Sequence, residues 1–238
     1  MALLGAWACN EGTGTTSADA SGNGNNLALG TGNGMGWGSG TGSEETNALS
    51  CVAGTVTGAT ATSSGLGGST AITLMGWVNP TDLAAGQNRP FFGLYGAAVS
   101  TEFAFWGERT IGPANVSQIE LRTTGLNELG GPALTVGTFV HVAATYDGAH
   151  LLYYVNGTQV ASAAITGGLT TPTLLIVGGV TGNSASANCL VNDIRLYSQV
   201  LTQSQIALCM GIAVTSEPDP LNPPPPASAG GLLLAAFP

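Results

Sequence analysis

The sequence predicts an all-β fold: a two-sheet antiparallel sandwich of the jelly-roll type with one short helix near its C-terminal end. Three observations support this prediction. Apolar runs of strand length recur along the chain, clusters of Gly, Asn, Pro and Ser separate them, and helical periodicity is nearly absent. About ten short strands at such spacing are typical of a sandwich or jelly roll. The expected strand regions are 3–9, 48–54, 71–80, 89–96, 102–108, 118–124, 139–148, 150–165, 173–179 and 188–199.

Two dipeptides place tight turns between neighbouring strands. Asn156-Gly157, in "YYVNGTQVAS", offers two residues that tolerate positive φ between two β-prone runs, the strongest hairpin signal in the chain. Asp147-Gly148, in "TYDGAHLL", repeats the pattern. The strands on either side of these turns are therefore expected to form a meander.

One short helix is expected in "VLTQSQIALCM". Thr202 is a natural N-cap and Gln205 follows three residues later, which is the spacing of a capping box. Ile206, Leu208 and Cys209 are then expected to face the core over about two helical turns.

The composition changes after Val214, so we divide the chain into a sandwich over residues 1–213 and a Pro-rich arm over 214–238. The run of four prolines should be extended and stiff, because proline has no amide donor for a sheet. An apolar tip follows it. One interpretation is an arm that docks on a partner or a neighbouring subunit, and the other is a disordered tail. The predicted docking residues are Pro223, Pro224, Pro225, Pro226, Leu232, Leu233, Leu234 and Phe237.

The charge pattern excludes some partners. The chain has four arginines, no lysine and thirteen acidic residues, for a net charge of −9. Four scattered arginines cannot form the basic patch that nucleic acid or an anionic membrane surface requires. We find neither a secretory signal nor a membrane-spanning run, because the apolar run near the end is too short. We therefore expect a protein made in the cytoplasm, or a virus protein released by lysis, unless a signal has been removed.

The four cysteines do not indicate a zinc site, because none of them form a CxxC pair. Two interpretations stay open. The cysteines are four buried thiols, or a disulfide links the start of the chain to its end. The residues concerned are Cys9, Cys51, Cys189 and Cys209.

The stretch "SADASGNGNN", residues 17–26, must turn tightly because Gly, Asn, Asp and Ser all favour turns. It also concentrates oxygen atoms of the kind that a hard cation such as calcium prefers. Taken alone, the stretch is either a hydrophilic loop tip or a cation site.

Several segments in order resemble the laminin G-like, concanavalin A-like domains found in bacterial and phage surface proteins. These are "LLGAWACNEGTGTTSADASGNGNNLAL", "NALSCVAG", "ITLMGWVNP", "FVHVAATYDGAHLLYYVNGTQVAS" and "VNDIRLYSQVLTQSQI", and the likeness runs from about residue 2 to 212. The resemblance is specific for the fold and weakly specific for function. It implies one structural calcium ion that ties the first loop to the closing strand. Its ligands would be Asp19, Asn23, Asn25 and Asn192, although members often carry an acid where this chain has Asn192.

We expect no enzymatic activity. Glycan-cleaving members of this fold need two carboxylates facing the scissile bond, and the chain has no E-x-D-x-E pattern. Glu44 and Glu45 are adjacent in a loop, whereas Glu102, Glu108, Glu120 and Glu128 are isolated in the sequence. His141 lies on a strand and is expected to be structural.

Four tryptophans divide into two pairs. Trp7 and Trp77 lie inside strand patterns and are expected in the core. Trp37 and Trp106 lie in loop or strand-end settings and are the candidates for stacking on a sugar ring.

Two functions follow from these observations. The first is a noncatalytic protein on the surface of a large assembly, most plausibly a phage virion. It would be a capsid decoration protein or a tail-associated adhesin, homo-oligomeric and docked on capsid or tail subunits through its C-terminal arm. The second is a secreted, extracellular carbohydrate-binding or adhesion module that binds surface glycans.

Overall fold

The computed structural model describes the residues of the sandwich and the segment that follows α1. The described ranges are 3–30, 35–41, 44–52, 59–62, 71–83, 90–96, 102–107, 116–123, 125–169, 172–179, 186–215 and 217–222. Within this part of the chain, no helix has the length and apolar character needed to cross a bilayer.

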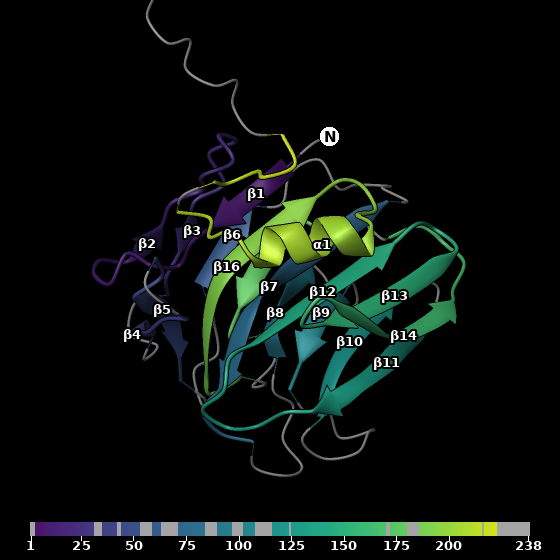
Figure 1. The fold of residues 1–238 in the computed structure, drawn as a ribbon, viewed down its shortest axis with the longest axis horizontal. Helices are drawn as coiled ribbons and strands as arrows, with labels where there is room; N and C mark the ends of the chain where they lie inside the picture. The colour runs from purple at the N-terminus through teal and green to yellow at the C-terminus, as the bar shows by residue number, and fades with distance from the viewer. Residues whose placement is uncertain are drawn as a thin grey trace, which may run out of the picture.

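The first sheet contains eight strands in the order β14-β13-β12-β7-β16-β5-β4, with β1 added beside β16 (Figure 1). Neighbouring strands are antiparallel throughout it. Their bounds are β1 Leu3–Trp7, β4 Gly36–Ser39, β5 Asn47–Cys51, β7 Ile72–Pro80, β12 Val140–Tyr146, β13 His150–Val155, β14 Thr158–Ala164 and β16 Cys189–Tyr197.

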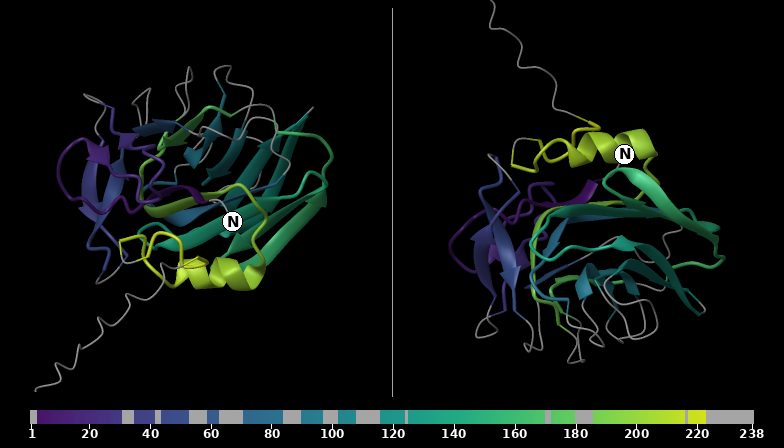
Figure 2. Two further views of the ribbon diagram at one scale, coloured as in Figure 1. Left: turned by 90° about the horizontal axis from the view of Figure 1, so that it is seen from above. Right: turned by 60° about the horizontal axis from the view of Figure 1, so that its bottom comes forward.

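The second sheet also contains eight strands, in the order β11-β10-β9-β8-β15-β6-β3-β2. It packs against the inner face of the first sheet, and the single described helix lies on the outer face of the first sheet (Figure 2). Its strand bounds are β2 Thr16–Ser17, β3 Leu27–Ala28, β6 Ala59–Thr62, β8 Pro90–Tyr95, β9 Glu102–Trp106, β10 Val116–Arg122, β11 Leu126–Ala133 and β15 Leu174–Val177.

The main core fills the space between the sheets. Successive side chains of a strand point to opposite faces, so Ile72, Leu74 and Val78 of β7 all point into this core. Aromatic rings connect the two layers: Phe105 on β9 lies 6.0 Å, centroid to centroid, from Tyr153 on β13. The predicted two-sheet antiparallel jelly roll is therefore confirmed.

Each strand region expected from the sequence contains a strand, but five strands were missed. Four of these, β2, β3, β4 and β6, have only two to four residues, which is too short for an alternation pattern. Trp37 was expected in a loop or strand-end setting, and it lies on β4, Gly36–Ser39, an edge strand paired with β5. The fifth, β11, carries Gly130-Gly131 and Pro132, which hide its strand character.

Both predicted hairpins are confirmed. Asn156 and Gly157 have φ of 48° and 74°, as the tight turn between β13 and β14 requires. In the turn between β12 and β13, the Asp147 side chain accepts hydrogen bonds from the backbone N–H groups of Ala149 and His150.

Helix α1 spans Gln203–Met210 and begins with the predicted capping box of Thr202 and Gln205. Ile206 and Cys209 pack on the outer face of the first sheet, as expected. Leu208 is 45% exposed, so its predicted core position is wrong.

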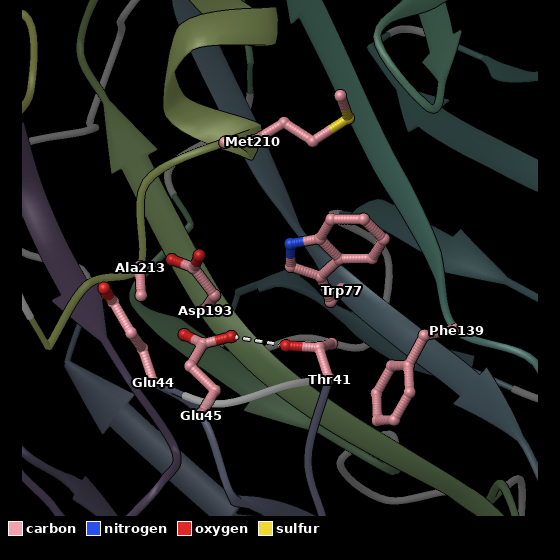
Figure 3. Close-up of a pocket in the computed structure, with 9 residues that line it drawn as sticks. Thr41, Glu44, Glu45, Trp77, Phe139, Asp193, Met210 and Ala213 are labelled. Atoms are coloured by element: carbon pink, nitrogen blue, oxygen red, sulfur yellow. Dashed lines mark hydrogen bonds between the residues drawn. The ribbon is translucent and has the colours of Figure 1, made fainter.

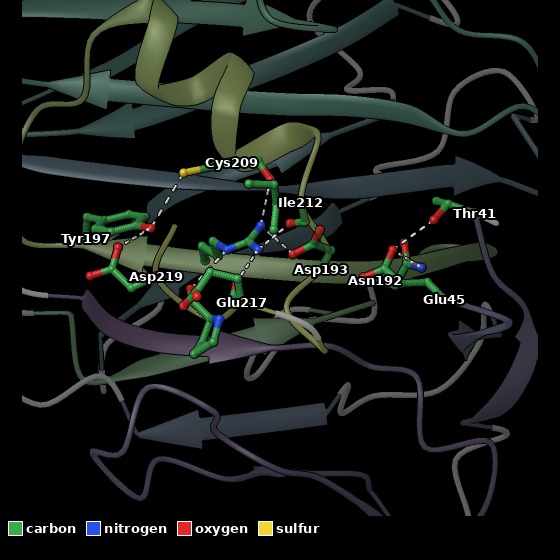
Figure 4. A network of polar contacts seen from close by, with 11 residues as sticks. Thr41, Glu45, Asn192, Asp193, Tyr197, Cys209, Ile212, Glu217 and Asp219 are labelled. Carbon is green, nitrogen blue, oxygen red and sulfur yellow. Dashed lines mark hydrogen bonds and ion pairs between the residues drawn. The ribbon is translucent and has the colours of Figure 1, made fainter. Parts of the chain in front are cut away.

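The chain continues to pack on the first sheet after α1, because Arg195 of β16 binds it. The guanidinium donates to four backbone carbonyls: Nε to Pro218 (3.2 Å), Nη1 to Cys209 (2.9 Å), and Nη2 to Ile212 (2.5 Å) and Glu217 (3.0 Å) (Figure 4). Val214 and Pro220 are buried. These contacts lie on both sides of residue 213, where the sequence divides the chain, and the division into a sandwich and an arm stays a prediction. Residues 223–238, which contain every predicted docking residue, lie outside the described part of the chain.

Candidate functional site: a pocket beside helix α1

The site begins where the central strand β16 changes its partner. Residues 189–191 of β16 pair with β5, and residues 194–197 pair with β1. Asn192 and Asp193 lie between these two ladders, at a shift in register against β7. Asp193 has a φ of 54°, a conformation that non-glycine residues rarely adopt, and its N–H donates to the Ala8 carbonyl at 3.1 Å. Such a bulge redirects side chains, and here it faces a cavity.

The cavity has a volume of about 490 Å³ and lies on the outer face of the first sheet (Figure 3). Its walls come from three places: the β4–β5 connection, strands of the first sheet, and the end of α1 with the segment that follows it. The lining residues are Thr41, Glu44, Glu45, Trp77, Phe139, Asp193, Met210, Gly211 and Ala213. The size and mixed lining are those of a small-molecule or saccharide site.

Trp77 forms an aromatic wall of this cavity. It projects from β7 and is partly exposed, and the His141 ring on neighbouring β12 lies against it edge-on, at 5.3 Å between centroids and 70° between planes. Burial, together with the smaller effect of the nearby Arg195 charge, lowers the pKa of His141 to about 3. His141 is therefore neutral at pH 7 and acts as a structural support for the indole, as its predicted structural role requires.

Glu45 forms the polar floor. Its Oε2 accepts hydrogen bonds from the Thr41 hydroxyl at 2.8 Å and from the Asn192 amide at 3.1 Å. Its Oε1 is buried and has no hydrogen-bond partner among the described residues. Burial raises the pKa of Glu45, while the Thr41 hydrogen bond and the Arg195 charge oppose that rise.

Asp193 joins the pocket to the Arg195 network. Its Oδ1 lies 2.6 Å from Nη1 of Arg195, and both side chains are almost fully buried (Figure 4). The pKa of Asp193 is raised to about 8. Burial is the largest cause, Arg195 opposes the rise by attraction, and the neighbouring Glu45 adds to it. The pocket thus holds two carboxyl groups that gain protons more readily than ordinary acids.

The predicted calcium loop is closed by its own hydrogen bonds. Asp19 Oδ1 accepts from the N–H groups of Ala6 and Ser21, and Oδ2 accepts from Asn25, all at 3.0 Å. The Asn23 amide donates to the Leu3 and Leu4 carbonyls. These contacts tie the loop to β1.

The fourth predicted ligand, Asn192, does not join this loop. Asp19 bridges to Trp7 on the side of β1 that faces away from β16, since Trp7 also pairs with Ile194. Two strand spacings put Asp19 about 10 Å from the backbone of β16. The Asn192 amide instead donates to Glu45. The predicted set of four ligands and the calcium ion stay predictions.

The two predicted sugar-stacking tryptophans lie away from the pocket. Trp37, on the edge strand β4, is partly buried, and its Nε1 donates to the Gly14 carbonyl at 3.1 Å. Trp106, on β9, is only 3% exposed and packs with Tyr95, Ala104 and Ile176 on the outer face of the second sheet. Trp106 therefore cannot offer a ring face to solvent, because its strand-end position is covered.

Acidic residues lie close together in two places in the described part of the chain. Glu44, Glu45 and Asp193 line the same cavity. Glu120 and Glu128 are directly opposite each other on β10 and β11, and Arg122 lies 3.5 Å from the fully buried Glu120. The sequence has no E-x-D-x-E motif, but the fold still places acids that are distant in the sequence next to each other.

All four cysteines are free and buried. Cys51 and Cys189 are opposite each other in the β5–β16 ladder, and their thiols are hydrogen-bonded. The structure therefore favours the interpretation as buried thiols.

Sequence reasoning missed Trp77, Glu45 and Asp193 as pocket residues. One signal was available for Trp77. It lies an even number of residues from Thr73 and Met75 on β7, so its side chain points to the same face as theirs and away from the core residues of that strand. No local signal pointed to Glu45 or Asp193, because their proximity depends on strands distant in sequence.

Comparison with protein families identifies the fold family. The model of the concanavalin A-like lectin/glucanases superfamily matches residues 53–207, most of the chain, and the protein belongs to this family. The resemblance inferred from the sequence is confirmed. No curated protein sequence matches the chain.

Solved structures with the same fold include binding domains. Domain 4 of AbnA, a GH43 extracellular arabinanase from Geobacillus stearothermophilus, in complex with arabinotriose, superposes with a TM-score of 0.65 at 17% identity, over 87% of this chain and 97% of that one. The receptor binding domain of botulinum neurotoxin D gives 0.66 at 12% identity, over 88% of this chain. Trypanosoma rangeli sialidase gives 0.61 at 14% identity. The match spans 52% of the toxin domain and 32% of the sialidase, and identities this low show the fold alone.

Proposed function

We propose that this protein is a noncatalytic carbohydrate-binding module that holds a glycan in the pocket beside α1. The observation that carries the proposal is the cavity of about 490 Å³, in which a partly exposed indole, Trp77, faces hydrogen-bonding carboxyl groups. An aromatic face packs on the apolar face of a sugar ring, and a few convergent polar groups fix its hydroxyls.

A second cavity supports binding of a chain rather than a single sugar. It has a volume of about 250 Å³ and shares Phe139 with the first pocket. Its other walls come from the end of β11, the start of β12 and the β13–β14 turn. An oligosaccharide with one unit on Trp77 would cross Phe139 and place its next unit there.

The solved relatives support this function by analogy. One is an arabinanase domain in complex with arabinotriose, and others are toxin binding domains. An arabino-oligosaccharide is therefore a rational first ligand, and we place the protein outside the cell or on a surface.

We propose a binding role rather than hydrolysis because protein groups hold one oxygen of each of the two buried acids of the pocket. Asp193 contacts Arg195, and Glu45 accepts two hydrogen bonds through Oε2. A glycosidase needs one carboxyl to protonate the leaving group and another to attack or to activate water. Incubation of the protein with fluorogenic glycosides should release no dye. If the wild type releases dye and Glu45→Gln does not, the protein is an enzyme and the proposed binding role is wrong.

The binding test is a glycan array followed by calorimetry on the best ligand. Trp77→Ala should weaken affinity at least about tenfold, which corresponds to about 1.4 kcal/mol. Trp37→Ala is the matched control, since it also removes an indole but from the edge strand β4, and it should bind like the wild type. Equal losses in both variants, or none in Trp77→Ala, would move the site away from this pocket.

A second function, a subunit of a large assembly such as a capsid or tail, is favoured by one observation. The chain has an apolar tip on a proline-rich arm beyond residue 222. Removal of residues 223–238 should abolish incorporation into particles and oligomers while the sandwich keeps its melting temperature. Unchanged incorporation would reject this docking role.

A further inference from the structure

The walls of the pocket beside α1 have an unusual charge. Three of the lining residues, Glu44, Glu45 and Asp193, are acids, and none of the described lining residues is basic. Among the described residues, the cation that contacts this wall is Arg195, whose donors go to four carbonyls and Asp193. Arg195 therefore holds the wall in place from behind and has no donor left for a ligand.

Glu45 supplies an acceptor for a ligand. The residue is 4% exposed, Thr41 and Asn192 fix its Oε2, and its Oε1 is without a hydrogen-bond partner among the described residues. The Oδ1 of the fully buried Asn192 also has none. Buried acceptors of this kind are costly unless a donor reaches them. In Figure 3 the Glu45 carboxyl group lies between Thr41 and Asp193, on the cavity side of the sheet.

Trp77 offers a second attraction for a cation. The face of an indole attracts a positively charged group within about 6 Å. The adjacent His141 does not oppose this attraction, because it is neutral at pH 7. Acidic groups and an indole thus border one cavity (Figure 3).

We propose that this pocket selects glycans that carry a protonated amine, namely unacetylated amino sugars, with the ammonium group on Glu45 and the sugar ring on Trp77. The inference rests on the proposed glycan-binding function and narrows its ligand class. An ammonium group has three donors and a positive charge, which match the free Glu45 oxygen and the acidic walls. Uronic and sialic acids would meet the carboxyl groups of Glu44 and Glu45 here and are rejected.

The experiment compares two trisaccharides that differ only in acetylation: the trimer of glucosamine and the trimer of N-acetylglucosamine. Calorimetry on the full chain at pH 6 should show that the amine form binds at least about tenfold more tightly, and that this preference falls as salt rises. Glu45→Gln keeps the shape of the side chain and should remove the preference.

Glu11→Gln is the matched control, because it removes one negative charge from an exposed residue outside the pocket. It should keep the preference. If Glu45→Gln unfolds, Glu44→Gln, at an exposed position of the same wall, should reduce the preference instead.

The outcomes separate the two proposals. If the acetylated trimer or a neutral glycan binds as well as the amine through Trp77, the module still binds glycans and the amine selectivity is refuted. If Glu11→Gln lowers the preference as much as Glu45→Gln, the attraction comes from the net charge and not from the pocket. If no glycan binds, the proposed function fails and the amine inference fails with it.

Discussion

Replacement of Arg195 by methionine should destabilise the protein more than any other arginine substitution within the described residues. Arg195 is 1% exposed, and its contacts include four backbone carbonyls and the carboxyl group of Asp193. Methionine fills a similar volume and cannot donate. The carbonyls after α1 would then lose their donors in a buried setting.

The magnitude follows from these contacts. Removal of one member of a buried ion pair costs about 3–5 kcal/mol, and each lost hydrogen bond from a charged group about 1.5–3 kcal/mol, although such costs do not add. Asp193 limits the cost at low pH, because its raised pKa lets it take up a proton and avoid an unpaired buried charge. We expect a loss of about 4 kcal/mol at pH 9, or about 8–16 °C in Tm for a domain of this size, and a smaller loss at pH 5.

The assay is urea unfolding followed by tryptophan fluorescence, at pH 5 and at pH 9. The loss in Arg195→Met should be larger at pH 9, where Asp193 ionises, and the added substitution Asp193→Asn should recover part of that difference. Glu217→Ala is the control, since Arg195 contacts only the backbone carbonyl of Glu217. It should stay within about 0.5 kcal/mol of the wild type. A melting temperature of Arg195→Met within about 2 °C of the wild type would refute the reasoning.

Three further predictions concern pH, thiols and calcium. The folded-state pKa of Asp193 is raised from 3.8 to about 8, so its contribution to stability is complete below pH 4 and is lost as pH rises to 8. Asp193→Asn should flatten the fall in stability across that pH window. A profile of stability against pH that runs parallel to that of the wild type would contradict this. The four buried thiols should react with Ellman's reagent only after unfolding, because burial keeps the reagent away from the sulfur atoms; fast labelling of the folded protein would disprove it. Calcium should raise the melting temperature of the wild type, and Asp19→Asn should remove that response; identical melts in calcium and EDTA would exclude the ion.

Features that depend on a few neighbouring residues could be predicted from the sequence. The Asn156-Gly157 turn and the Thr202 capping box were both correct, because their geometry is fixed by side chains and φ preferences within four residues. The longer strands were also correct, since β7, β12 and β16 have enough residues to show their apolar character.

The pocket could not be predicted in the same way. Asn192 and Glu45 are 147 positions apart, and they meet only because β4–β5 pairs with one half of β16 and β1 with the other. Trp106 shows the converse: its strand-end position suggested exposure, but its burial depends on how the second sheet is covered. Composition and local pattern carry no information on either point.

One structural feature, the partner change along β16, links binding to stability in this protein. The bulge at Asp193 turns a carboxyl group toward both the pocket and Arg195, and Arg195 in turn holds the carbonyls of Cys209 and Ile212. Those carbonyls fix the end of α1, which supplies Met210 and Gly211 to the pocket wall. Arg195 is therefore a positioning residue for ligand binding without lining the cavity. Arg195→Met should weaken glycan affinity even at temperatures where it remains folded, and Trp77→Ala should weaken affinity with little change in Tm. Weakened binding in Arg195→Met, measured well below its melting temperature, would show that the chain after α1 forms part of the site.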